Sequence, residues 1–174
     1  PANKYYFDNI KLQIVTKGNT IPLTPEEKKE ALTRAMNNWI EGMMKATGGY
    51  VTTWDVVNEA ISGGGNDGEG FYVLQSASNA GADAANNFYW QDYLGSEDYV
   101  RIVVAAARKY YAENGGVKPL KLFINDYNLE STWDNNQKAK SLVHWIEKWE
   151  SDGVTKIDGI GTQMHVAYRA NAAD

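Results

Sequence analysis

Three apolar runs of strand length, each followed at once by polar side chains, constrain the fold of this chain more than any other feature. They cover residues 51–58, 120–125 and 157–165. The stretches between them keep apolar residues at helical spacing. A strand–helix–strand–helix–strand order is typical of a parallel sheet whose helices take the outer layer. In such α/β sheets and barrels the reacting groups lie where strands end, so the polar clusters are the candidate functional positions.

The helical stretches carry their own start and stop signals. In the first, Thr24 can cap the helix, Pro25 suits its first position, and Glu27 completes a capping box. Glycine pairs follow the first two stretches and a single glycine follows the third, as expected of helix ends. The sequence therefore predicts helices over residues 24–48, 96–115 and 135–149.

The first apolar run ends in the segment WDVVNEA, residues 54–60. Here the strand core leads directly into the amide of Asn58 and the carboxyl of Glu59. A Glu at a strand end can give or take a proton, and a neighbouring Asn can hold a substrate hydroxyl. The alternative is a solvated Glu that merely ends an ordinary strand.

Composition excludes several classes of function. The net charge is −5 and no Lys/Arg-rich run occurs, which argues against nucleic acid as a partner. No apolar run approaches the roughly 20 residues of a membrane span, so no membrane insertion is expected. The chain has two histidines, no cysteine and no HExxH motif, so no catalytic metal is expected. The six Trp and eleven Tyr could stack on sugar rings or fill a core.

A glycine-rich segment follows the first strand. Gly63, Gly65 and Gly68 formally satisfy the G-x-G-x-x-G pattern of dinucleotide sites. No clean helix opens after Gly68, and Asp67 and Glu69 would repel a pyrophosphate. We therefore expect a flexible loop at this position and no cofactor.

Three long motifs, in order along the chain, carry a resemblance to a known family. They are WDVVNEA at 54–60, LFINDYN at 122–128 and GIGTQMH at 159–165. Together they resemble glycoside hydrolase family 10, the endo-1,4-β-xylanases. The resemblance implies an α/β fold, the (β/α)8 TIM barrel, present here only as a partial barrel of about strands 4–6 with flanking helices. Such a barrel usually needs about 250 residues, so the rest must come from missing sequence or another chain.

The resemblance also implies roles for residues of the first and third motifs. Glu59 matches the general acid/base, and Asn58 matches the residue that binds the sugar 2-hydroxyl. Gln163 and His165 alternate on one expected strand, so their side chains should point the same way. By resemblance Gln163 lies against the substrate and His165 near the nucleophile. The alternative for His165 is a core histidine with satisfied hydrogen bonds.

The second motif supplies two more candidates and a question about the nucleophile. Tyr127 and Asn128 fall where the family builds its leaving-group side, although loop packing would explain them equally well. The family's nucleophile is a Glu on the seventh strand, and no matching motif follows His165. In-chain substitutes would be Asp126 or Glu130, and by resemblance Asp126 is structural. The nucleophile is therefore expected to be missing from this chain, which alone should be inactive.

The first residues do not fit the barrel motifs. Residues 1–16 resemble the last strand of a carbohydrate-binding β-sandwich, although an irregular N-terminal strand is an equal alternative. Residues 17–174 would then be the partial barrel. The start of the chain is polar and aromatic, unlike a signal peptide. By resemblance, however, the parent protein is secreted, periplasmic or attached to the cell surface.

The resemblance implies retaining hydrolysis of internal β-1,4-xylosidic bonds, with xylan or a xylo-oligosaccharide as partner. One alternative is a non-catalytic carbohydrate-binding fragment that keeps Asn58 and Gln163 but lacks the chemistry. A second is a structural piece that works only with another chain. Glu59 favours the enzyme, and the unmatched nucleophile favours the other two for this polypeptide alone.

Overall fold

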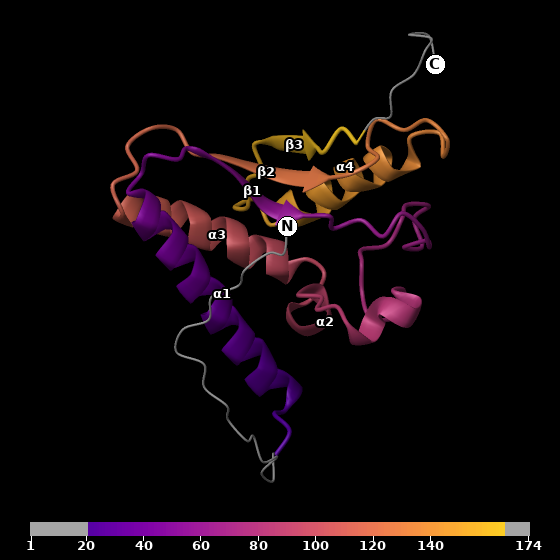
Figure 1. Cartoon of the computed structure of the whole chain (residues 1–174), viewed down its shortest axis with the longest axis horizontal. Helices are drawn as coiled ribbons and strands as arrows, with labels where there is room; N and C mark the ends of the chain where they lie inside the picture. Colours follow the sequence, from indigo (N-terminus) through magenta and orange to yellow (C-terminus); the bar gives the residue numbers. More distant parts are fainter. Residues whose placement is uncertain (1–20, 166–174) are drawn as a thin grey trace, which may run out of the picture.

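The computed structural model describes residues 21–165, which fold into a small parallel sheet with helices packed against it (Figure 1). The elements follow the order α1 (Pro25–Thr47), β1 (Thr53–Asn58), η1 (Gly81–Ala85), α2 (Gln91–Leu94), α3 (Asp98–Glu113), β2 (Lys121–Asp126), α4 (Gln137–Glu150) and β3 (Gly159–Thr162). The three expected strands and the three expected helices are confirmed. The short elements η1 and α2 were not predicted. Residues 1–16, assigned above to a separate terminal strand, lie outside the described residues.

The sheet has the strand order β1-β2-β3, and both pairings are parallel. This is the arrangement that right-handed crossovers between successive strands predict. One expectation was wrong: the third strand ends at Thr162 rather than at His165. Its pairing stops where β2 ends, at the pair Asp126–Thr162, and Met164 then takes a left-handed backbone with φ 50°. Gln163 and His165 therefore do not alternate along a strand.

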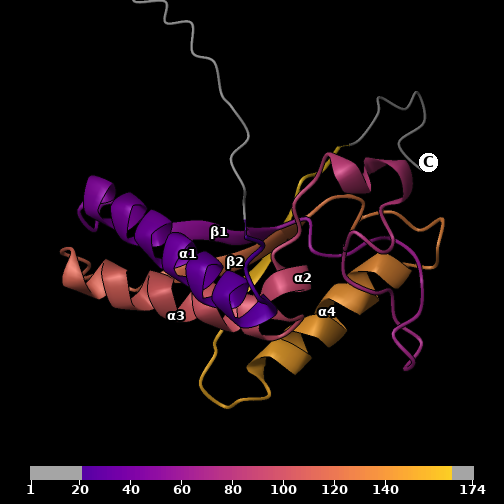
Figure 2. The ribbon, with the colours of Figure 1, turned by 90° about the horizontal axis from the view of Figure 1, so that it is seen from below.

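The helices cover one face of the sheet. In Figure 2, α1, α3 and α4 lie in front of the strands. Alternate residues of β2 point to this side, and Leu122, Ile124 and Asp126 are fully buried. Phe123 and Asn125, between them, are only partly buried. The partly exposed face of the sheet is therefore the one that presents Asn125.

Helix α1 shows how local sequence fixes an element. Glu27 N donates to Thr24 Oγ1 at 3.2 Å, and Thr24 N donates back to a Glu27 carboxylate oxygen at 2.8 Å. This is the predicted capping box, which satisfies two backbone donors at the helix start. At the other end Gly48 adopts φ 52°, a left-handed conformation that suits glycine. The apolar side of α1 packs on α3 and buries Met36, Ile40 and Met44.

A glycine in β3 allows the strands to meet closely beside the polar cluster. Gly161 pairs with Asn125, and a Cβ on Gly161 would lie 2.7 Å from Asn125 Oδ1. Any side chain here would push the Asn125 amide away. Among the described residues, no helix is long and apolar enough to cross a membrane.

Candidate active site

The end of β1 is shaped by an irregularity in its pairing with β2. The register shifts between Asp55 and Val57, so Val57 faces Ile124 and Asn58 faces Asn125. A bulge of this kind re-aims the side chains that follow it. Consequently Asn58 lies beside Asn125 at the carboxyl end of the sheet.

A chain of amide hydrogen bonds joins the three strand ends. Asn125 Nδ2 donates to Asn58 Oδ1 at 2.8 Å. Gln163 Nε2 donates to the same oxygen at 3.2 Å and to Glu59 Oε1 at 2.8 Å. His165 Nε2 lies 2.8 Å from Gln163 Oε1. The structure thus brings Asn58, Glu59, Asn125, Gln163 and His165 together at one edge of the sheet.

Glu59 itself is held in an unusual backbone conformation. Its φ is 56°, in the left-handed region that residues other than glycine rarely adopt. Its N–H donates to the Asn125 carbonyl at 2.8 Å, and its own carbonyl accepts a hydrogen bond from Gln75 Nε2 at 2.6 Å. The carboxyl accepts from Gln163 and is partly exposed, so one side of it is open to a substrate.

Tyr127 and Asn128 do not join this hydrogen-bond chain. The Tyr127 ring lies under the Lys138 ammonium, with Nζ 3.3 Å from the ring centroid. Asn128 has φ 58°, which turns the chain after β2. Both side chains are partly buried. The structure supports the loop-packing alternative for Tyr127, and neither residue is bonded to Glu59; their role toward a substrate stays a prediction.

The two in-chain candidates for a second carboxylate are engaged elsewhere. Asp126 is fully buried, and its Oδ1 lies 2.7 Å from Lys138 Nζ. Its Oδ2 accepts from Ile61 N at 3.1 Å. Glu130 Oε2 accepts from Thr162 Oγ1 at 3.1 Å. Asp126 is therefore a structural carboxylate, as the resemblance implied.

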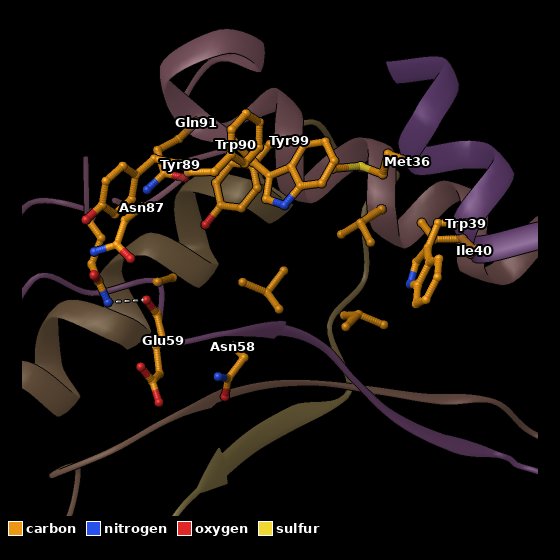
Figure 3. Close-up of a pocket in the computed structure, with 16 residues that line it drawn as sticks. Met36, Trp39, Ile40, Asn58, Glu59, Asn87, Tyr89, Trp90, Gln91 and Tyr99 are labelled. Atoms are coloured by element: carbon orange, nitrogen blue, oxygen red, sulfur yellow. Dashed lines mark hydrogen bonds between the residues drawn. The ribbon is translucent and has the colours of Figure 1, made fainter. Parts of the chain in front are cut away.

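A cavity of about 610 Å³ opens beside Glu59. In Figure 3, Tyr89, Trp90 and Tyr99 lie across it from the end of β1, and the side chains of Glu59 and Asn58 point away from it. Its walls come from β1, from helices α1 and α3, and from the segment before α2. The aromatic segment before α2, which lines this cavity, was not among the residues predicted for the site.

The glycine-rich segment is more ordered than expected. Residues 60–75, called here the 60–75 loop, leave β1 after Glu59 and fold back on themselves through an antiparallel bridge between Ile61 and Leu74. The far part docks on α4, where Phe71 stacks on His144 with ring centroids 4.0 Å apart. Trp145 Nε1 donates to the loop backbone at 2.9 Å. The 60–75 loop is therefore held against α4 by these contacts, whereas a flexible loop was expected.

An ion cluster fastens the tip of the 60–75 loop. Asp67, Glu69 and His144 offer ligand atoms that all lie within 4.8 Å of one another. However, Lys148 Nζ lies 3.4 Å from Asp67 and 2.7 Å from Glu69, so these carboxylates already share a cation. Burial alone would raise the pKa of Asp67. Hydrogen bonds from the loop backbone, His144 and Lys148 outweigh burial and hold that pKa well below its usual range.

Comparisons with known proteins agree with the geometry. The family model for Glycosyl hydrolase family 10 matches residues 17–174. The chain is 32% identical, over 147 residues, to endo-1,4-beta-xylanase A of Halalkalibacterium halodurans, which covers 84% of this chain. It also resembles the structure of a GH10 protein from Paenibacillus barcinonensis, with TM-score 0.58, 30% identity and 79% of this chain covered.

A further solved relative is xylanase 10B of Thermotoga petrophila in complex with xylobiose. Its TM-score is 0.56 and its identity 25%, over 83% of this chain. In each case the chain spans only part of the relative: 30% of the Halalkalibacterium protein and 34% of each of the two solved chains. The likeness therefore covers nearly all of this chain and about a third of the relatives.

Proposed function

Since the chain belongs to glycosyl hydrolase family 10, whose fold is the (β/α)8 barrel, we propose that it is part of an endo-1,4-β-xylanase in which Glu59 is the general acid/base. One observation carries this assignment. Glu59 ends a strand at the edge of the sheet where Asn58 and Gln163 meet, and its partly exposed side chain accepts a hydrogen bond from Gln163 there. These groups lie at or just after the ends of β1 and β3, two of the three strands of the partial barrel.

The reaction needs two carboxyl groups on opposite sides of the scissile bond. Glu59 would protonate the departing glycosidic oxygen while a second carboxylate attacks the anomeric carbon and forms a glycosyl-enzyme. Glu59 would then take a proton from water as that water displaces the sugar, with net retention of configuration. Because the sequence spans about a third of its relatives, the second carboxylate is expected from the remainder of a complete barrel.

The amide groups would act on the sugar. The Asn58 side chain is oriented by two amide donors, from Asn125 and Gln163, so its own amide group is held ready for a hydroxyl. Gln163 bridges Asn58 and Glu59 and would keep the acid beside the bound sugar. His165 would not contact the sugar and would act indirectly, by fixing the Gln163 amide.

Xylan or a xylo-oligosaccharide is the proposed substrate. Two of the relatives named above are xylanases, and one of these is solved with xylobiose. A polysaccharide cannot enter a cell, so the parent protein is proposed to act outside the cytoplasm.

The test compares Glu59→Ala with the unchanged enzyme, in the full-length protein that contains this sequence. Hydrolysis of xylan should fall roughly 10²–10⁴-fold, because its poor leaving group needs protonation. The burst of phenol from an aryl xylobioside with a good leaving group should fall much less. Equal losses on both substrates would overturn the role of Glu59. Xylan binding without any turnover by the unchanged protein would favour the carbohydrate-binding alternative.

A further inference from the structure

Glu59 keeps a backbone conformation that its own residue type disfavours. Its φ of 56° places it in the left-handed region, where a side chain crowds the following carbonyl. Such a conformation persists in a folded protein only when the surroundings hold it there. The contacts that hold the Glu59 peptide therefore decide where its carboxyl points.

Two hydrogen bonds clamp this residue from both sides. On one side, Glu59 N donates to the Asn125 carbonyl oxygen at 2.8 Å and extends the pairing of β1 with β2. On the other, Gln75 Nε2 donates to the Glu59 carbonyl oxygen at 2.6 Å, the bond drawn dashed beside Glu59 in Figure 3. The first bond uses backbone groups only. The second depends on one side chain, so a single substitution can remove it.

Gln75 is itself fixed by the return of the 60–75 loop. Its N–H donates to the Ala60 carbonyl at 2.8 Å, next to the bridge between Ile61 and Leu74. Leu74 and Ile61 are buried, so the backbone that leads into Gln75 is held in place. The loop thus returns to the strand end from which it left and delivers an amide donor to Glu59.

We propose that Gln75 is a positioning residue for the general acid/base, an inference that rests on the proposed function of Glu59. Gln75 contacts the Glu59 carbonyl, not its carboxyl, so it would act by fixing the peptide and hence the direction of the side chain. Without this bond the Glu59 peptide can relax toward ordinary φ values, and the carboxyl leaves the line of proton transfer. The substrate-binding amides of Asn58 and Gln163 do not bond to Gln75, so substrate binding should change little.

The test replaces Gln75 by methionine, which keeps an unbranched side chain but removes the donor, in the full-length protein. On xylan, kcat should fall about tenfold or more while KM stays within about twofold, the pattern of an interaction lost in the transition state. The burst rate of phenol from an aryl xylobioside with a good leaving group should fall no more than about threefold, because that step needs little protonation.

Gln137→Met is the matched control. Gln137 Nε2 donates to the Gly70 carbonyl at 2.7 Å, so it too pins the 60–75 loop by an amide-to-carbonyl bond, but at the end away from Glu59. This variant should lower stability as Gln75→Met does, and should leave the ratio of xylan to aryl-xylobioside rates unchanged. Burst amplitude counts the functional sites, so partial misfolding does not enter the rates.

Gln75→Leu serves as a second variant if methionine prevents folding, since it also removes the amide donor and adds no charge. The same selective loss on xylan is expected. Equal losses on both substrates, or no loss, in the Gln75 variants would overturn the positioning role. Glu59→Ala separates the two claims. If Glu59→Ala shows the selective loss and the Gln75 variants do not, only this inference fails; if Glu59→Ala shows none, the proposed function fails with it.

Discussion

Glu59 and Asp126 are carboxyl residues at the same end of adjacent strands, yet their surroundings differ in almost every respect. Asp126 is fully buried, the backbone N–H groups of Ile61 and Tyr127 donate to it, and the Lys138 ammonium lies 2.7 Å from its Oδ1. The Glu59 side chain is only partly buried, on the face of the sheet that presents Asn125. Within residues 21–165 it accepts one hydrogen bond, from Gln163.

The difference separates a structural carboxylate from a chemical one. Each oxygen of Asp126 is taken by donors that hold β2, the 60–75 loop and α4 together. A group in that position cannot reach a substrate, and losing it would leave a buried lysine without its counter-ion. Glu59 is only partly buried, and among the described residues one of its two carboxyl oxygens accepts no hydrogen bond. A carboxyl residue at a strand end is therefore a candidate for catalysis. The number of protein groups that bind its oxygens then distinguishes a structural carboxylate from one that is free to react.

The largest effect expected on stability comes from Asp126→Asn. The variant leaves the Lys138 ammonium buried and unpaired, and breaking a buried pair in this way costs about 3–5 kcal/mol. Urea denaturation of the full-length protein measures the loss. The double variant Asp126→Asn with Lys138→Met removes both charges and should recover a large part of it. Wild-type stability in the single variant would mean that the ion pair does not hold this part of the fold.

A smaller effect, on activity, is expected from Gln163→Met. It removes the side-chain donor to Glu59 Oε1 and one of the two donors to Asn58. A hydrogen bond to a charged group contributes about 1.5–3 kcal/mol, so kcat/KM on xylan should fall roughly 10–100-fold. Urea denaturation should show little change, in contrast to Asp126→Asn. An unchanged kcat/KM would mean that Gln163 does not support Glu59 when substrate is bound.

The smallest effect is expected on stability, from the replacement of Asp67. Like Asp126, Asp67 is a carboxylate with a structural role. Its pKa is lower in the folded protein than in the unfolded chain. Its contribution to stability is therefore complete above the unfolded pKa of about 4 and is lost as the pH falls through the folded value. At pH 6, Asp67→Asn should have a lower free energy of unfolding than wild type. This difference in unfolding free energy should become smaller below pH 4. A constant difference across this range would show that ionised Asp67 does not fasten the loop.

Local signals in the sequence were enough for the sheet, the main helices and the position of Glu59. Thr24 and Glu27 form the predicted cap, and the three apolar runs form the predicted strands. The bond from Gln75 to Glu59 could not be predicted, because it depends on how the 60–75 loop closes, and the loop has no periodic pattern. The burial of Lys138 and its pairing with Asp126 could not be predicted either, because a lysine early in an amphipathic helix is normally exposed.

The end of the third strand was mispredicted for a related reason. The apolar pattern continues through Met164, and it contains no sign that β2, the only partner of β3 among the described residues, stops at Asp126. Backbone pairing therefore ended the strand, not its own composition. Gln163 and His165 still meet, by a side-chain hydrogen bond beyond the strand.

The most direct test of Glu59 as acid/base is azide rescue of Glu59→Ala on an aryl xylobioside with a good leaving group. Without Glu59 the glycosyl-enzyme forms but hydrolyses slowly, because no base activates water. Azide needs no such base, so it should raise steady-state turnover and yield a xylobiosyl azide of β configuration, the retained product. The unchanged enzyme should show neither effect. Failure of azide to raise turnover or to form this product, with folded protein and a normal phenol burst, would contradict the assignment.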